Sequence, residues 1–170
     1  VAQQAIANGH RVVVGFFPTA LTDDESFDII CFNDALEHIS DPATILDSCY
    51  AHLPIGGLLS ITIPIRSGFF YRAACVFSSV GIGAPMDRMW QTAFPSPHIS
   101  YFSQQNLELL AQRVGFEPVA ATHLPSLTAK GLWSRLRYDR TSSIATAIAQ
   151  YIALLPITFF LKFLPADIGH

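Results

Sequence analysis

Side chains that can move a proton or bind a metal ion occur in one short segment and again much later in the chain. Asp34, Glu37 and His38 lie within five residues, and His98 follows sixty residues after His38 (98 − 38). An unperturbed histidine titrates near pH ~6.5, so each imidazole is a candidate general base. Carboxylates and imidazoles are also ligands for divalent ions. The pattern therefore indicates proton transfer or metal-assisted chemistry.

The apolar segment at residues 27–32 precedes these polar side chains. Its near-continuous hydrophobicity predicts a strand covered on both faces, as in a parallel sheet. Asn33 and Asp34 end the segment. Ligands of open α/β sheets bind beyond the carboxyl ends of the strands, so both side chains are candidates for ligand contact. Helix capping is the alternative interpretation.

A helix and a second strand follow. The Asp-Pro pair that begins at Asp41 predicts a helix start, and the helix should run to about His52. A glycine pair that begins at Gly56 turns the chain. Residues 58–63 predict a buried strand, which ends at Pro64. Strand, helix and strand at this spacing predict a right-handed βαβ unit.

This unit resembles the carboxyl half of the class I S-adenosylmethionine-dependent methyltransferases. The matching elements are Phe27-Asp28, Leu36-Glu37-His38, Asp41-Pro42, the Leu-x-P-G-G-like turn at 53–57, and the segment 98–103 with the helix that ends at 115–117. The resemblance covers roughly residues 5–121. It implies an α/β fold, a doubly wound and mostly parallel Rossmann-like sheet, and methyl transfer as the activity.

The resemblance also implies a cofactor, S-adenosylmethionine, and the residues beside it. Asn33, Asp34, Ala35 and His38 would lie near the methionine moiety. A strand at residues 11–14 would be followed by the residues that flank the adenine, which here are Gly15, Phe16 and Phe17. Phe16 stands where the family often has an acidic residue, so stacking would replace that contact. The alternative is that Phe16 and Phe17 are core residues.

His38 and His98 are the catalytic candidates. His38 is the leading base, although in many family members this histidine is structural, and His98 is a candidate substrate-pocket residue together with Tyr101. The Asp34, Glu37, His38 and His98 pattern resembles the magnesium site of small-RNA 2′-O-methyltransferases. Asp34 replaces the first glutamate of that site, and no basic surface for RNA is evident. We therefore assign no metal ligands.

The chain is interpreted as a single partial methyltransferase domain over residues 1–170. The family's glycine-rich loop would precede Val1, so we expect an N-terminally truncated chain that is inactive alone. Residues 65–97 would form a lid insertion and residues 123–164 a helical apolar insertion. Residues 165–168 resemble the entry to the family's last, antiparallel strand.

The acceptor is predicted to be a small molecule or a lipid-like compound. Aromatic residues of the lid could line an apolar pocket, with an arginine to hold an acidic group: Phe69, Phe70, Tyr71, Trp90, Phe94, Arg66, Arg72 and Arg88. The alternative is that these rings pack the lid on the domain. The net charge of −3 leaves no basic footprint for nucleic acid. Cys31, Cys49 and Cys75 predict buried free thiols in a reducing cytosol.

The segment at residues 144–164 is strongly apolar and has basic neighbours. A lid or a docked helix pair is the favoured interpretation. Peripheral membrane contact through 144–164 is the second, and a membrane span is the least favoured because the chain must rejoin the sheet. The predicted location is the cytoplasm, with association at a membrane surface as an option.

Two other function classes stay open. A non-catalytic Rossmann-like binding module would share the fold. A dinucleotide-dependent oxidoreductase would share the βαβ unit, although the Leu36-Glu37-His38 element and the Gly56 turn argue against it.

Overall fold

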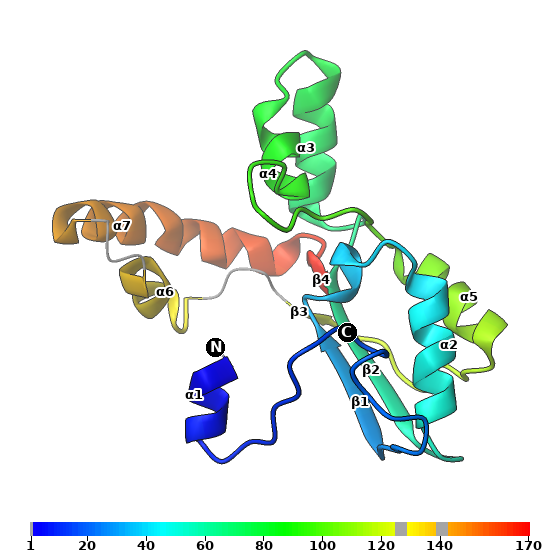
Figure 1. The fold of residues 1–170 in the computed structure, drawn as a ribbon. Coiled ribbons are helices and arrows are strands. Elements are labelled where there is room, and N and C mark those ends of the chain that lie inside the picture. Colours follow the sequence, from blue (N-terminus) through cyan, green and yellow to red (C-terminus); the bar gives the residue numbers. More distant parts are fainter. Residues whose placement is uncertain (1, 125–128, 139–142) are drawn as a thin grey trace.

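The computed structural model describes residues 2–124, 129–138 and 143–170 (Figure 1). Its elements in chain order are α1 (Ala2–Ala7), β1 (Ile29–Asn33), η1 (Leu36–His38), α2 (Pro42–His52), β2 (Leu58–Pro64), α3 (Phe69–Ser79), α4 (Ala84–Trp90), α5 (Gln104–Val114), β3 (His123–Leu124), α6 (Leu132–Tyr138), α7 (Ile144–Phe160), η2 (Leu161–Phe163) and β4 (Ile168–Gly169).

The sheet is small and mixed. Its four strands lie in the order β1-β2-β4-β3. β1 and β2 are parallel, with Ile29 opposite Leu58 and Asn33 opposite Thr62. β4 runs antiparallel to both β2 and β3. The predicted strand-helix-strand unit is thus confirmed, but the described residues do not form the doubly wound, mostly parallel sheet that the sequence predicted, because only one pair of strands is parallel.

The connection between β1 and β2 follows its local signals. Asp41 caps α2, and its carboxylate accepts a hydrogen bond from the Thr44 N–H at 3.1 Å. Pro42 stands in the first turn, where its missing donor costs nothing. At the far end Gly56 adopts a φ of +85°, which favours glycine. The predicted helix over 42–52 and its glycine turn are confirmed.

α2 and α5 cover one face of the sheet (Figure 1). Ser103 caps α5 by accepting from the Asn106 N–H at 3.2 Å, and Gly115 ends it with a φ of +116°. The residues buried between helices and sheet form the core: Leu36, Ile45, Cys49, Ile63 and Ile65. This packing places the carboxyl end of β1 at the edge of the core.

The other face of β1 and β2 is open, contrary to the prediction of strands covered on both sides. Ile29 is 56% exposed and Leu58 is 50% exposed, and Cys31 is also exposed. The cause is the edge position of β1 together with a missing second helical layer among the described residues. Cys75 on α3 is exposed too, so of the three free thiols only Cys49 is buried as predicted.

Residues 11–14 form no strand, which corrects a second prediction. Val13 is 46% exposed and Val14 is 84% exposed. A β-branched run forms a strand only where a neighbouring strand completes its hydrogen-bond ladder, and β1 pairs here with β2 alone. The helix α1 precedes this segment, and Gly9 follows it with a φ of +86°.

Two helical pairs project from the sheet (Figure 1). α3 and α4 pack on each other within the predicted lid, and α6 packs on α7 within the predicted apolar insertion. Among the residues that the structure describes, no helix combines the length and the apolarity needed to cross a membrane. After α7 the chain returns to the sheet as β4, as the segment at 165–168 predicted.

Candidate functional site

The polar end of β1 forms one side of the candidate site. Asn33 and Asp34 are exposed there, and the Asp34 N–H donates to the Thr62 carbonyl at 2.9 Å. Asp34 has a φ of +49°, a left-handed conformation that aspartate tolerates better than most residues. This bend turns the chain sharply into η1. The two predicted cofactor contacts therefore lie open to solvent at a strand end.

η1 carries the central carboxylate into the protein. Leu36 is fully buried in the core, and Glu37 is 1% exposed. The Glu37 carbonyl accepts hydrogen bonds from the Ile99 N–H at 2.9 Å and the Ser100 N–H at 3.2 Å. The segment that contains His98 is thus held against η1 by the backbone. His38 and His98, which are sixty residues apart in the sequence, are therefore in direct contact.

His98 is held in one tautomer. The Tyr101 hydroxyl donates its proton to the Met89 carbonyl at 2.7 Å, so it must accept from the Nδ1–H of His98 at 3.0 Å. The Nε2 atom of His98 is then the acceptor, and the Gln91 amide lies 2.9 Å from it. Burial lowers the pKa of His98, and the nearby His38 lowers it further. His98 is therefore neutral at neutral pH.

His38 is held in the same tautomer as His98, with its proton on Nδ1. Its Nδ1 atom lies 2.9 Å from the Pro97 carbonyl, which can only accept, so Nδ1 carries the proton. Its ring stands edge-on to the ring of His98, with centroids 4.8 Å apart. The Nε2 atom of His38 therefore carries no proton and has a lone pair. The second imidazole of the site can thus take up a proton at Nε2.

The two Nε2 atoms converge on the Glu37 carboxylate. Each lies 4.0 Å from Oε1 of Glu37. Oε2 of Glu37 is buried without a hydrogen-bond partner, and burial raises the pKa of this carboxyl. A buried polar atom without a partner is costly, and a catalytic role, a bound water or a bound ion can account for it. We name Glu37, His38 and His98 the acid-imidazole cluster; it can share a proton, and its ligand atoms lie within 4.8 Å of one another, close enough to hold a metal ion.

The lid supplies aromatic rings to this cluster. Tyr71 and Trp90 lie beside Tyr101, with ring centroids 4.7 Å and 5.0 Å from it. Burial raises the pKa of Tyr101, so its hydroxyl stays protonated. Of the other lid residues singled out by sequence, Phe69 packs on Phe70, and Arg88 lies over the Phe94 ring. Arg66, Arg72 and Arg88 are exposed.

Sequence reasoning missed two partners of His98. The Gln91 amide and the Met89 carbonyl both contact the His98–Tyr101 pair. Gln91 ends α4 in a left-handed conformation with a φ of +53°. No residue type in the sequence signals this turn, because glycine or asparagine is usual there. The signal that could have pointed to these partners is the number of aromatic and polar residues close to His98 in the sequence.

The segment predicted to flank the adenine lies beside β1. Phe17 packs on Phe32 of β1, with ring centroids 6.0 Å apart, whereas Phe16 is 87% exposed. Gly15 has no room for a side chain, because an added Cβ would lie 2.6 Å from the Ala20 Cβ. Phe17 is therefore a core residue, as the alternative interpretation had it. The exposed Phe16 remains free for stacking.

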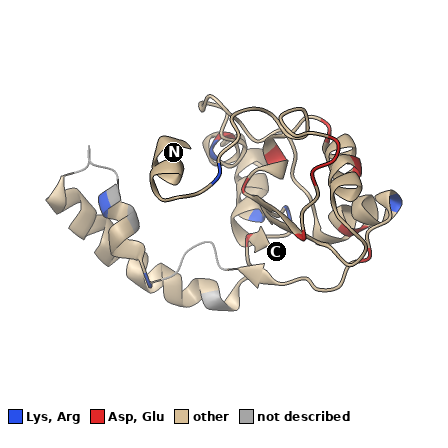
Figure 2. Cartoon of the chain, turned by 60° about the horizontal axis from the view of Figure 1, so that its bottom comes forward, with Lys and Arg blue, Asp and Glu red and all other residues tan. Residues whose placement is uncertain are grey.

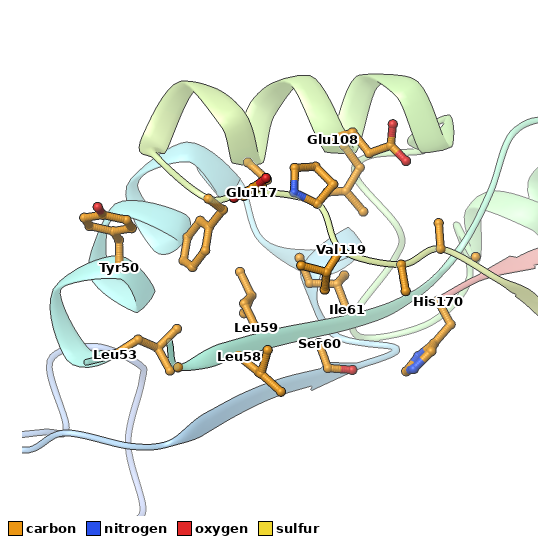
Figure 3. Close-up of a pocket in the computed structure, with 18 of the residues that line it drawn as sticks. Tyr50, Leu53, Leu58, Leu59, Ser60, Ile61, Glu108, Glu117, Val119 and His170 are labelled. Carbon is orange, nitrogen blue, oxygen red and sulfur yellow. The ribbon is translucent and has the colours of Figure 1, made fainter. Parts of the chain in front are cut away.

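A cavity of about 860 Å³ lies elsewhere, between β2, α5 and the segment that follows α5 (Figure 3). Leu59 and Ile61 of β2 line one wall, and Val119 lies across from them. None of the predicted site residues lines this cavity. We therefore place the candidate site at the acid-imidazole cluster, where the polar and titratable groups gather, and not at the larger apolar hollow.

The parallel β1–α2–β2 unit with polar groups at the carboxyl edge defines an α/β protein of the ligand-binding kind. A family model described as "Methyltransferase domain" matches residues 2–121. The match covers more than half of the chain, so the chain belongs to this family of methyltransferase domains, as its motifs predicted. Enzymes of the family transfer methyl groups and generally use S-adenosylmethionine. No curated protein matches the chain.

Proposed function

We propose that this protein is an S-adenosylmethionine-dependent methyltransferase that acts on a small-molecule or lipid-like acceptor. One observation supports this most: the acid-imidazole cluster begins in η1, directly after the polar end of β1, with Glu37 buried, and its His98 ring contacts Tyr101, which in turn contacts Tyr71. A merely structural helix start would not require a buried carboxylate without a partner. The family assignment supplies the reaction class.

The proposed cofactor contacts are those at the carboxyl edge of β1. Asn33, Asp34 and Ala35 would hold the methionine moiety, together with His38. Gly15 and Phe16 would flank the adenine, with the exposed ring of Phe16 for stacking, and Phe17, packed on Phe32, would support this segment from the core. The bound cofactor supplies an electrophilic methyl group on a sulfonium, whose S–C bond breaks as the acceptor atom forms the new bond.

His38 is the proposed general base. Its Nδ1–H is tied to the Pro97 carbonyl, so its Nε2 lone pair can take a proton from an acceptor hydroxyl. His98, neutral through burial, would position that hydroxyl through its Nε2 atom once the Gln91 amide has moved away from it. Glu37 would stabilise the imidazolium that forms, since its carboxylate lies 4.0 Å away.

The aromatic residues of the lid support the proposed acceptor class. Tyr71, Trp90 and Tyr101 present aromatic surface next to the cluster, which suits an apolar or amphipathic molecule. The net charge of −3 disfavours nucleic acid as a partner. A quinone precursor or a lipid intermediate has the required chemistry.

Binding of S-adenosylhomocysteine, measured by calorimetry on the gene product that carries residues 1–170, tests the assignment. We expect a Kd of about micromolar order and no binding of nicotinamide dinucleotide. Asn33→Ala or Asp34→Ala should weaken binding about 3- to 10-fold, as the loss of one hydrogen bond predicts. Asn8→Ala, at the exposed end of α1, is the matched control and should bind normally.

The other outcomes separate the competing functions. Dinucleotide binding without homocysteine binding would support the oxidoreductase. Binding of neither compound by a folded protein would contradict the methyltransferase proposal and favour the non-catalytic binding module.

A second candidate role for the same cluster is to hold a divalent ion that activates the acceptor. Two observations favour it: Oε2 of buried Glu37 has no hydrogen-bond partner, and the Nε2 atoms of two imidazoles each lie 4.0 Å from Oε1 of the same carboxylate. Their opposite nitrogens are fixed by a carbonyl and a hydroxyl, as is usual for metal-bound histidines. For zinc the ligand atoms would have to draw inward to about 2.0–2.2 Å from the ion, and the Gln91 amide would have to leave His98.

Titration with Co²⁺, followed by visible absorption and by thermal unfolding, tests this role without an acceptor. Binding should give the absorption of an imidazole-bound ion and raise the melting temperature. Glu37→Gln should abolish both signals, whereas Glu108→Gln on α5 should not. Absence of any signal with the wild-type protein at millimolar Co²⁺ would leave His38 as the base.

A further inference from the structure

α7 carries an exposed apolar stripe. Five large side chains are each at least 40% exposed and recur at intervals of three or four residues: Ile144, Ile148, Ile152, Leu155 and Phe159. This spacing places all five along one face of the helix. No charged residue occurs between Ile144 and Phe160. Contiguous exposed apolar surface of this kind marks an interaction site.

A face of α7 beside this stripe packs against α6. Trp133 meets Tyr151 edge-on, with ring centroids 5.8 Å apart, and both Leu132 and Ala147 are buried. The pair extends away from the sheet, with α7 at its outer side (Figure 1). The exposed apolar stripe therefore has no partner among the described residues of the domain.

Charge is divided unevenly between this helical pair and the rest of the chain. Residues 129–166 contain five Lys or Arg and one Asp, a net charge of +4 (5 − 1), and all other residues together carry −7 (5 − 12), which sums to the total of −3. In Figure 2 the acidic residues lie in the helices and loops around the sheet, and α7 is without charge. The apolar stripe is thus flanked by basic sequence and remote from the acidic part.

We infer that the exposed apolar stripe of α7 lies in the surface of an anionic lipid bilayer, with the helix parallel to the membrane plane. Its basic flanks match anionic headgroups, and the acidic remainder of the protein is repelled toward solution. A second copy of the chain is a poorer occupant, because that contact would bring two regions of charge +4 together. Membrane binding by α7 does not depend on the proposed methyltransferase function. If both hold, membrane binding would bring the candidate site close to an acceptor that resides in the lipid.

Vesicle flotation with the full-length protein tests this inference. We expect binding to vesicles of mixed phosphatidylglycerol and phosphatidylcholine, little binding to phosphatidylcholine alone, and weakening by about 0.5 M NaCl. The double variant Ile148→Glu/Ile152→Glu should bind at least about tenfold more weakly. Its matched control, Val80→Glu/Ile82→Glu, adds the same charge at apolar residues that are 69% and 50% exposed near the lid tip, and it should bind like the wild type.

Three results would overturn the inference. The first is that the folded wild-type protein does not float with the vesicles. The second is that both double variants lose binding equally. The third is that the wild type binds no vesicles but forms a dimer in light scattering, and that the α7 variant abolishes this dimer. S-adenosylhomocysteine binding, measured in parallel, is independent of the stripe. Flotation can therefore fail while the methyltransferase proposal holds, and the protein can also float with vesicles while the methyltransferase proposal fails.

Discussion

Gly68 is the residue whose substitution best tests how the last strand joins the sheet. It caps α3 with a φ of −67°, so alanine can adopt its backbone without strain. A Cβ added there would lie 2.5 Å from the Asp167 Cα, a backbone atom that cannot turn away. Asp167 also accepts the Phe70 N–H at 2.7 Å. Gly68→Ala must therefore push β4 away from the start of α3.

The magnitude follows from these contacts. Overpacking costs about 1–3 kcal/mol, and loosening the bond from Phe70 to the Asp167 carboxylate adds to it, so the free energy of unfolding should fall by about 2–4 kcal/mol. Gly83→Ala is the matched control, because Gly83 also caps a helix and its added Cβ would meet nothing nearer than the Asp87 carboxylate at 3.9 Å. It should cost less than about 1 kcal/mol.

Urea unfolding of both variants, analysed by linear extrapolation, measures the difference. Equal costs for the two substitutions would refute the reasoning. Residues 165–169 would then not pack on the start of α3, and the tail beyond the family match would have to join the sheet elsewhere.

Three further predictions concern single side chains. Cys31 and Cys75 should react with iodoacetamide in the native protein, whereas Cys49, whose pKa burial raises to about 12, should be labelled only after unfolding, as mass spectrometry would show. In metal-free buffer the His98 ring should titrate below 6.5 by NMR, because burial disfavours its charged form. Its folded-state pKa is lowered, so its contribution to stability is present above pH 6.5 and is lost as the pH falls. Leu46→Ala, at a fully buried position, should lower the free energy of unfolding by about 2–5 kcal/mol in urea.

Elements with local signals could be predicted from the sequence. Asp41 and Ser103 accept hydrogen bonds from the backbone three residues on, and Gly115 ends α5 in a left-handed conformation. These caps depend on neighbouring residues only, so residue type and spacing suffice to find them. The order of motifs along residues 2–121 likewise sufficed for the family.

Exposure of the strands could not be predicted. The apolar run that became β1 has the composition of a strand buried on both faces, yet Ile29 is 56% exposed. The hydrophobicity of a side chain sets its preference for a buried environment. Whether it is buried depends on which helices and strands from the rest of the chain pack against it. For the same reason the valines at 13 and 14 did not form a strand, since no ladder partner met them.

The candidate site divides in the same way. Residue types singled out His38 and His98 as candidate bases, and the resemblance to methyltransferases placed both in motifs of that family. Tertiary structure alone decided that both imidazoles present Nε2 to the Glu37 carboxylate. That orientation depends on the Pro97 carbonyl and the Tyr101 hydroxyl, which only the packing of the lid against η1 brings within hydrogen-bond distance.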